Sequence, residues 1–416
     1  MKNILIAIRS IFKKGRHNVM KIVSLGIGLA VGLVLIAKVY FEQSYDDFYP
    51  DRDRVYQVWA KYQQNGGELK DYPQTSGGIA PTMQQQIPEI ETVTRYTSFG
   101  DWTFTMTDTK MKYSGRCIIA DSCFFDILPR PMLIGNAKEV LSTPMYVLIS
   151  SRIAKNIGGD VIGKNFTVDN SPGRTMTIGG VFEEVPENSH SRYDVIVSMA
   201  SAGRFMWEGS PTNMLGNDRY ISYVKLHKGV NPLALEEQVR TFVNSYFPPE
   251  EQQKVGLSID FSFHKLDNLH KELPQVKRMT WILSLLAFAL IFTAVMNYIL
   301  IVISSIVNRS KEVAVHKCYG ASENNIHGMM FGEALVHIVL SLILALLLIL
   351  AFRGTVEELL ATSLDSLLLS NGSLVLLGIC ILVFFVSGFM PGSLYARIPV
   401  ASAFRNYREK SEAKRS

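Results

Sequence analysis

Residues 280–306 read TWILSLLAFALIFTAVMNYILIVISSI, an apolar run without a charged side chain. A helix needs about 20 predominantly apolar residues to cross the hydrocarbon core of a bilayer. Three other runs of comparable length lie at residues 19–41, 331–352 and 373–395. The sequence therefore predicts four membrane-spanning helices, one near the start of the chain and three in its last third.

The interval between the first two apolar runs predicts a large domain outside the membrane. Residues 42–276 contain no comparable run, whereas the intervals 308–328 and 353–372 are short. We therefore expect an α-helical membrane domain of four transmembrane helices, with a large α+β extracytoplasmic domain inserted between helices 1 and 2. This plan suits moving or sensing something across a membrane better than it suits soluble catalysis.

Basic residues gather before the first run, between the second and third, and after the fourth. The positive-inside rule places these three segments, residues 1–18, 308–328 and 396–416, in the cytoplasm. Anionic lipid headgroups are a sufficient partner for the net charge of +5, so no nucleic acid is expected. The basic residues are Lys2, Arg9, Lys13, Lys14, Arg16 and Lys21, then Arg309, Lys311 and Lys317, then Arg397, Arg405, Arg408, Lys410, Lys414 and Arg415.

The first apolar run could be a signal peptide or a retained anchor. Residues 19–41 are longer than a signal-peptide core, and no small-residue cleavage site follows them, so we expect an anchor. Apolar and basic residues alternate at helical spacing within residues 1–18. This pattern predicts a short amphipathic helix on the cytoplasmic membrane surface, although an ordinary juxtamembrane flank explains it equally well.

The large domain shows both strand and helix patterns. Apolar and polar residues alternate over 257–263, which is typical of a half-buried strand. Asn231 and Pro232 together form a suitable helix N-terminus. We therefore expect an α+β domain, rich in strands and turns over about residues 90–215 and built of two subdomains. Its predicted strands include residues 56–62, 145–149, 176–182 and 257–263, and its predicted helices residues 78–86, 151–157 and 232–247.

The sequence lacks the patterns of catalytic and metal sites. Residues 158–165 (GGDVIGKN) approach a P-loop, but Asn165 stands where Mg²⁺ binding requires Ser or Thr. We expect a turn leading into a strand at this position. His264 and His270 do not have the spacing of metal ligands. We therefore expect a chain that is not an enzyme and that holds neither a metal nor a cofactor.

The four cysteines fall in three compartments in this topology. Cys117 and Cys123 lie outside, Cys318 lies in the cytoplasm and Cys380 lies in the fourth run. Only the first two could form a disulfide in an oxidising compartment. The sequence leaves open whether they do, and reduced, buried thiols are the alternative.

Four residues in the apolar runs are candidates for helix packing or for a dimer contact. Gly28 and Gly32 form a small-xxx-small pair that allows another helix to approach closely. Asn297 is a polar residue late in a span and is expected to face protein, because exposure to lipid is costly. Glu333 lies one helical turn before His337, and we expect both to pack between helices.

The segment after the second apolar run carries the most specific motif of the chain. From Asn297 it reads N-x₁₁-R-x₂-E-x₄-K-x₂-G-A-S, ending at Ser322. This run resembles the cytoplasmic junction of MacB/FtsX-type ABC transporter permeases. The resemblance covers nearly the whole chain in order, with Pro391-Gly392 as a departure where the family usually has Pro-Ala. Its other matching stretches are residues 8–30, 121–136, 162–164, 181–190 and 387–392.

The resemblance implies a permease subunit of the bacterial inner (plasma) membrane. A MacB-like periplasmic core domain would lie between FtsX-like helices, with both termini in the cytoplasm. A separate cytosolic ABC ATPase would bind and hydrolyse ATP, and a second permease copy or a paralogue would complete a dimer. The resemblance further implies mechanotransmission, in which the helices carry the closure of the ATPase to the periplasmic domain. The exported substrates would be drugs, peptides or envelope components, with a periplasmic adaptor and an outer-membrane channel as further partners.

The resemblance also assigns a coupling role to residues around 308–328. These residues would shape or contact the seat of the ATPase; the alternative is that their charges cap helices and meet lipid headgroups. They are Arg309, Lys311, Glu312, Lys317 and Gly320.

Two other functions remain open at this stage. One is a lipoprotein-releasing permease, and the other is an FtsX-like regulator of a cell-wall hydrolase or a membrane signalling module. The sequence gives neither the substrate nor the choice between homodimer and heterodimer.

Overall fold

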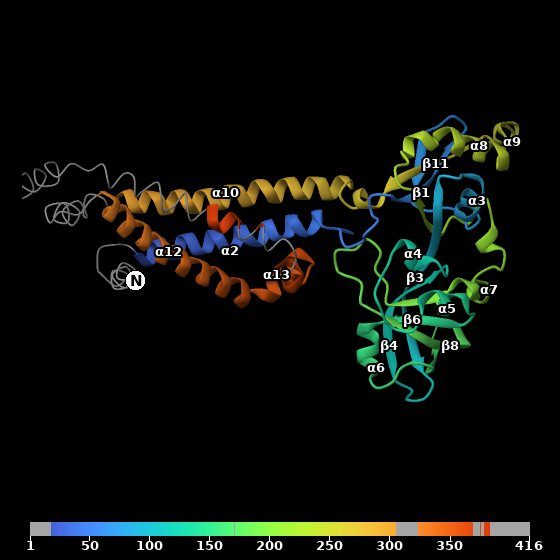
Figure 1. Cartoon of the computed structure of the whole chain (residues 1–416), viewed down its shortest axis with the longest axis horizontal. Coiled ribbons are helices and arrows are strands. Elements are labelled where there is room, and N and C mark those ends of the chain that lie inside the picture. The colour runs from blue at the N-terminus through green and yellow to red at the C-terminus, as the bar shows by residue number, and fades with distance from the viewer. Residues whose placement is uncertain (1–17, 170, 305–322, 369–374, 376–377, 383–416) are drawn as a thin grey trace, which may run out of the picture. The chain divides into compact units, whose positions relative to one another are not determined.

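The computed structural model divides the chain into two compact units (Figure 1). The helical unit comprises residues 1–43 and 274–416, and the sheet unit is the continuous segment Ser44–Leu273. The sheet unit falls within the predicted residues 42–276. The structure describes residues 18–169, 171–304, 323–368, 375 and 378–382.

Three described helices are long and apolar enough to cross a membrane, namely Asn18–Gln43, Pro274–Ser304 and Phe331–Ala351. They correspond to the first three predicted spans. The predicted fourth span, 373–395, lies outside the described residues except for 375 and 378–382. The described helices of this unit are α2 (Asn18–Gln43), α10 (Pro274–Ser304), α12 (Glu323–Ala351), α13 (Arg353–Leu360) and α14 (Leu364–Leu368).

The helical unit is built around α2, which packs along both α10 and α12 (Figure 1). These helices are apolar on nearly all sides, which is typical of helices that lipid or protein surrounds. Their backbone groups are bonded within each helix, which a bilayer core requires. The shared core includes Leu25 and Leu29 of α2, Tyr298 of α10 and Ile338 of α12.

The sheet unit contains a mixed sheet of 11 strands in its described residues. Its main path runs β11-β1-β10-β3-β4-β9-β6-β8-β5, with β2 on β1 and with β7 between β3 and β8. The pairs β4–β9 and β6–β8 are parallel, and the other pairs are antiparallel. The strands are β1 (Val55–Gln64), β2 (Leu69–Tyr72), β3 (Ile90–Met106), β4 (Lys112–Ala120), β5 (Met132–Ile134), β6 (Tyr146–Ser150), β7 (Asn165–Val168), β8 (Ser171–Phe182), β9 (Val195–Ser198), β10 (Ile221–Leu226) and β11 (Leu257–Lys265).

Six of these strands close into a ring. β3 pairs with β4 and β7, and the circuit continues through β9, β6 and β8 back to β7. Trp102, Phe104 and Met106 alternate along β3 and point into the core of this ring. The short helices near the ring are α4 (Phe124–Ile127), α5 (Ala137–Ser142), α6 (Ser151–Ile157) and α7 (Ala202–Phe205).

The other lobe consists of β11, β1, β10 and the first half of β3. Figure 1 shows α3, α8 and α9 grouped with β1 and β11. Val58 and Val224 from the sheet pack with Phe242 of α8 in this lobe's core. Its helices are α3 (Ile79–Gln86), α8 (Glu236–Tyr246) and α9 (Pro249–Val255).

The 17-residue strand β3 joins the two lobes. Its register shifts between Ser98 and Gly100, and Gly100 has φ +73°. A bulge bends a strand and increases its local twist, and glycine accepts this positive φ without strain. One strand can therefore pair with β10 in one lobe and with β7 in the other. The unit thus has two lobes, in line with the two expected subdomains, and the lobes share a continuous sheet.

The structure confirms the local predictions made for this unit. The Asn231 side chain accepts a hydrogen bond from the Leu233 N–H, and the helical segment starts as a 3₁₀ turn, Pro232–Leu235. Residues 158–164 form the turn between α6 and β7, as predicted. Cys117 and Cys123 are free thiols, with Cys117 buried. Burial raises the pKa of the Cys117 thiol, which keeps it protonated and unreactive.

Candidate functional site at the connector junction

The predicted coupling residues lie outside the part of the chain that the structure describes. These are Arg309, Lys311, Glu312, Lys317 and Gly320. The other predicted residues, Gly28, Gly32, Asn297 and Glu333, are described and lie in the helical unit.

Gly28 and Gly32 lie on the side of α2 that faces α10. A Cβ atom built on Gly28 would lie 2.2 Å from the Cβ of Ala294, and one on Gly32 would lie 2.4 Å from Ile291 Cγ1. Gly26 faces α12 instead, where an added Cβ would lie 2.9 Å from Leu344 Cδ2. Glycines therefore set close approaches of α2 to both neighbouring helices within one chain.

The side chain of Asn297 is exposed in the single chain, whereas Tyr298 beside it is buried. The Tyr298 hydroxyl lies 3.4 Å from Nδ1 of His337 on α12. Tyr298 therefore makes a polar contact between α10 and α12, and the role of Asn297 in helix packing or a dimer contact stays a prediction.

Glu333 and His337 are both buried on α12, together with Lys21 and Asn18 on α2. The Ser341 hydroxyl of α12 donates to the Ile22 carbonyl of α2 at 3.1 Å, which aligns the two helices at this level. Buried polar side chains in membrane helices mark packing or functional positions. The sequence identified Glu333 and His337 and missed the contribution of Lys21.

A second polar contact of the helical unit lies near the other end of α2, and we call it the Lys38 latch. The ammonium group of Lys38 lies 2.6 Å from Glu42 Oε1 and donates to Thr362 Oγ1 at 2.7 Å. All three residues are buried. Leu364, which follows on α14, is buried in the same core as α2. The latch therefore attaches the segment between α13 and α14 to α2.

The sheet unit begins and ends with segments that are bonded together. We define the connector junction as residues 44–52, which follow α2 in the chain, residues 266–272, which precede α10, and the loop 187–192. The ring of Tyr45 stacks on that of His270, with centroids 3.4 Å apart. Lys271 lies 3.3 Å from Asp47 and 2.9 Å from Asp267. The first and last segments of the unit are thus held side by side.

The charges of the junction stabilise one another. Burial alone would raise the pKa of Asp267, but the hydrogen bond and charge of Lys271, together with the charge of Arg52, outweigh it and lower this pKa. The pKa of Lys271 is raised, because Asp267 and Asp47 outweigh its burial. Arg52 lies 3.1 Å from Asp47 and 3.6 Å from Asp267, so the four charges form one network.

Asp46 ties the first segment to the loop 187–192. It is fully buried and has φ +60°, a left-handed conformation that Asp adopts more readily than most residues. Its carboxylate accepts from the Ser189 hydroxyl at 3.1 Å and lies 2.7 Å from Nδ1 of His190. Its backbone N–H donates to the Asn188 carbonyl at 2.9 Å, and the Asn188 amide donates to the Ser44 carbonyl at 2.7 Å.

His190 links Asp46 to the sheet. A carboxylate only accepts, so Nδ1 carries the proton toward Asp46. Nε2 is bonded to the Tyr223 hydroxyl of β10, and it lies 3.0 Å from Ser191 Oγ, which in turn lies 2.6 Å from the Tyr96 hydroxyl of β3. Burial raises the pKa of Tyr223 far above its ordinary value and that of Tyr96 to about 12. Both phenols therefore stay protonated and keep their hydrogen bonds.

This arrangement shares its bonding order with a serine hydrolase triad but cannot act as one. Ser191, His190 and Asp46 are linked as nucleophile, base and acid would be. However, Ser191 is only 3% exposed, and its hydroxyl is also bonded to Tyr96. A substrate cannot reach this oxygen, so the network is structural. In the described residues, no cluster of His, Cys, Asp and Glu could hold a metal ion.

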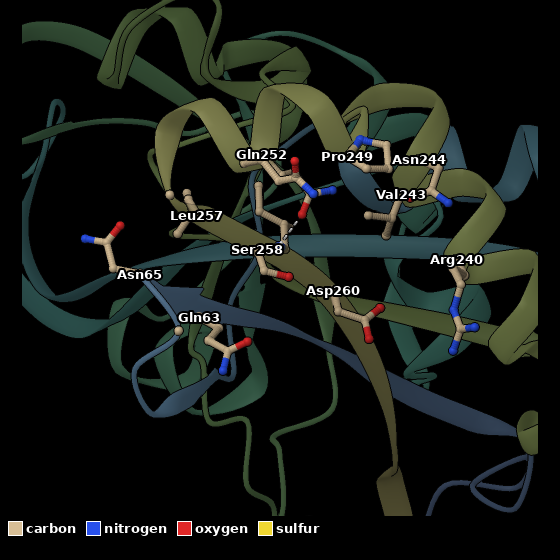
Figure 2. Close-up of a pocket in the computed structure, with 14 residues that line it drawn as sticks. Gln63, Asn65, Arg240, Val243, Asn244, Pro249, Gln252, Leu257, Ser258 and Asp260 are labelled. Carbon is tan, nitrogen blue, oxygen red and sulfur yellow. Dashed lines mark hydrogen bonds between the residues drawn. The ribbon is translucent and has the colours of Figure 1, made fainter.

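A cleft of about 420 Å³ lies in the other lobe, between β11 and the helices α8 and α9 (Figure 2). Figure 2 shows amide and charged side chains around it, including Gln63, Asn244, Arg240 and Asp260. Gln252 Oε1 accepts from the Ile259 N–H at 3.0 Å, and the Asp260 carboxylate accepts from the Phe261 N–H at 2.8 Å. The side chains of this cleft therefore satisfy backbone donors of β11, the strand at one end of the sheet path.

Comparison with protein families covers most of the chain. The model of the MacB-like periplasmic core domain matches residues 20–242, and that of the FtsX-like permease C-terminal region matches residues 284–400. The chain belongs to the MacB/FtsX-type ABC transporter permeases. These permeases are inner-membrane proteins with a periplasmic domain, are in general non-catalytic, and work with a partner ATPase. The sheet unit is the periplasmic domain of the permease.

Solved structures similar to this permease include a permease domain, a periplasmic region and an extracellular domain. A domain of a protein described as a permease from Porphyromonas gingivalis is 33% identical, with a TM-score of 0.48, over 52% of this chain and 91% of that chain. The periplasmic region of MacB from Actinobacillus actinomycetemcomitans is 16% identical, with a TM-score of 0.36, over the same shares. The extracellular domain of the noncanonic ABC-type transporter YknZ from Gram-positive bacteria is 11% identical, with a TM-score of 0.34, over 49% and 98%. A search of curated proteins gave no match.

The sequence located part of this junction without predicting its role. The run 181–190, from which the family resemblance was partly drawn, contains Asn188, Ser189 and His190. Nothing in the sequence indicated that Asp46, which is far away along the chain, would be their partner. The signal that could have identified it is a charged residue directly after a membrane span, where the chain turns back toward the sheet.

Proposed function

We propose that this permease transmits the ATP-driven movement of a separate cytosolic ATPase to its periplasmic domain, and thereby exports drugs, peptides or other envelope substrates. It would act as a dimer with a second copy or a paralogue, together with two ATPase subunits. A periplasmic adaptor and an outer-membrane channel would complete the export route. Four spans, with both termini in the cytoplasm, fit the basic residues of the sequence.

The observation that best supports a mechanical role is the connector junction. The periplasmic domain has two covalent connections to the helices, at Gln43–Ser44 and at Leu273–Pro274. The segments next to both connections are joined by the Tyr45–His270 stack and by the Lys271–Asp47 ion pair. Segments fixed in this way move as one body, which transmission of force requires.

The ATPase would act on the segment around residues 308–328. Arg309, Glu312, Lys317 and Gly320 match the family motif, and we assign them, together with Lys311, to the seat of the ATPase. Glu312 offers a direct test, because reversing its charge should disrupt a charged contact without removing a membrane span.

The first experiment is a pull-down of the tagged, detergent-solubilised chain, followed by an ATPase assay on the eluate. We expect a cytosolic ABC ATPase to copurify and to hydrolyse ATP. An adaptor in the same eluate would support efflux, whereas a cell-wall hydrolase would support a regulatory role instead. If no ATPase binds, the proposal fails in its central requirement.

The second experiment compares Glu312→Lys with Glu409→Lys, which makes the same charge change in the C-terminal tail. We expect Glu312→Lys to lower the ATPase activity stimulated by the permease while membrane insertion is unchanged. Glu409→Lys should leave both quantities unchanged. Equal stimulation in the two variants would remove Glu312 from the coupling site.

A further inference from the structure

The hydrogen bonds of the connector junction reach strands in the middle of the sheet rather than an edge strand. Tyr223 lies on β10 and Tyr96 lies on β3, two neighbouring strands in the interior of the sheet path. Both receive the connection from Asp46 through the side chains of His190 and Ser191. A displacement of the segment after α2 therefore reaches β10 and also β3, the strand that joins the two lobes.

The network is also built to keep one geometry. Asp46 is fully buried in a left-handed conformation, and the imidazole of His190 is held between the Asp46 carboxylate and the Tyr223 phenol. Breaking a buried, charge-assisted network is costly, because the groups left behind lose their partners inside the protein. The joint should therefore resist bending under load, unlike a connection through an exposed loop.

We propose that Asp46 and His190 are positioning residues, which make the two connecting segments and the sheet a single rigid body during the ATP-driven cycle. This inference rests on the proposed function and assigns its mechanical step to two named side chains. Neither residue would touch the substrate or ATP. Their loss should leave ATP hydrolysis in place and should separate it from the movement of the periplasmic domain.

The test measures that movement in the full chain with its copurified ATPase. Spin labels would be attached at Val255→Cys and Trp281→Cys, positions that are 73% and 75% exposed. The distance distribution between the labels is recorded without nucleotide and with ATP plus vanadate. Cys117 is buried and can remain. The other cysteines are removed as Cys123→Ser, Cys318→Ser and Cys380→Ser.

The main variants are His190→Ala and Tyr223→Phe, with Asp53→Asn as the control. His190→Ala removes the centre of the network, whereas Tyr223→Phe removes one hydroxyl and keeps the ring in place. Asp53 is exposed, so Asp53→Asn should change nothing. In both main variants we expect the ATP-dependent distance shift to fall to less than half, with ATPase binding and hydrolysis retained. A full shift in both would overturn the inference.

Rescue separates positioning from simple loss of stability. In His190→Asn, the side-chain amide can donate to Asp46 in place of Nδ1 of His190. We expect His190→Asn to recover part of the distance shift that His190→Ala loses; no recovery in a folded, ATPase-binding chain would contradict the proposed role. If His190→Ala cannot be extracted as a folded protein, Tyr223→Phe decides alone.

The outcomes also separate this inference from the proposed function. If the unmodified chain binds an ATPase but shows no ATP-dependent shift, mechanical transmission itself is wrong, and the inference falls with it. If the unmodified chain shows the shift and the variants keep it, the function stands and the assignment of Asp46 and His190 is wrong.

Discussion

Each of the two units contains a buried charged side chain that links distant segments, but the number of hydrogen bonds that make the link differs. In the helical unit, the Lys38 latch joins α2 to the segment between α13 and α14 through one hydroxyl group, that of Thr362. In the sheet unit, Asp46 binds Ser189 and His190 with its side chain and Asn188 with its backbone. The latch can therefore be released by losing a single bond, whereas the junction cannot. The helical unit depends on close helix packing instead.

The largest expected effect is at Asp46. Asp46→Ala removes the acceptor for His190 and Ser189 and places a residue with little tolerance for positive φ at +60°. We expect a loss of about 3–5 kcal/mol in the free energy of unfolding. Thermal unfolding of the solubilised chain would measure it, with the exposed Asp53→Ala as the control. Equal stability of the two variants would remove the distinction between junction and latch.

The next effect tests whether shape, rather than polar bonding, holds the helical unit together. Gly28→Ala would place a methyl group 2.2 Å from the Cβ of Ala294. We expect a cost of about 1–3 kcal/mol from overpacking, seen as faster proteolysis of the solubilised chain. The double variant Gly28→Ala with Ala294→Gly restores the space and should recover most of the loss. No recovery would show that the contact between α2 and α10 does not limit stability.

A smaller effect is expected at the latch. Thr362→Val keeps the side-chain shape and removes the hydroxyl that accepts from Lys38. The Lys38–Glu42 pair remains, so we expect a loss of about 1 kcal/mol. Labelling of a cysteine introduced as Ser363→Cys should become faster in Thr362→Val. Thr355→Val, the same substitution at an exposed position of α13, serves as the control. An unchanged labelling rate would mean that apolar packing alone holds this segment.

The smallest effect concerns two partly exposed carboxylates, those of Asp51 before β1 and of Glu91 on β3. The hydrogen bond from Lys225 holds the pKa of Asp51 below its ordinary value of 3.8, and that from Arg54 holds the pKa of Glu91 below 4.5. A lowered pKa in the folded state stabilises the protein above the ordinary pKa, and this contribution is lost as the pH falls through the folded value. Both carboxylates are more than one-third exposed, so we expect only about 0.5 kcal/mol. The stability difference between the unmodified chain and Lys225→Met should shrink from pH 7 to pH 3; a constant difference would contradict this.

The sequence predicted the elements of this fold better than their partners. The first three apolar runs and the alternation in β11 and β8 follow from local patterns, and the structure confirms the helices and strands that they predicted. The closed ring of strands did not follow, because it depends on β7 pairing with both β3 and β8. Pairing between distant segments leaves no local pattern in a single sequence.

In the candidate site too, the sequence indicated which residues matter better than it indicated their partners. Glycine spacing indicated that α2 packs closely, but which of Gly26, Gly28 and Gly32 faces which helix depends on the rotation of α2. Tyr298 rather than Asn297 faces α12 within one chain, because one residue along a helix turns the side chain by about 100°. The only sequence signal for Asp46 was its place directly after a membrane span, since its burial follows from the turn of the chain after α2.

The side-chain hydrogen bonds along β11 affect whether two copies of this permease can pair through their sheets. Gln252 and Asp260 take up the N–H groups of Ile259 and Phe261, which would otherwise be free to extend the sheet. An unpaired edge strand is a template for pairing with another molecule. Copies of one permease carry the same β11 edge, so such pairing could otherwise join them. Blocking this edge lets neighbouring copies collide without fusing into a common sheet.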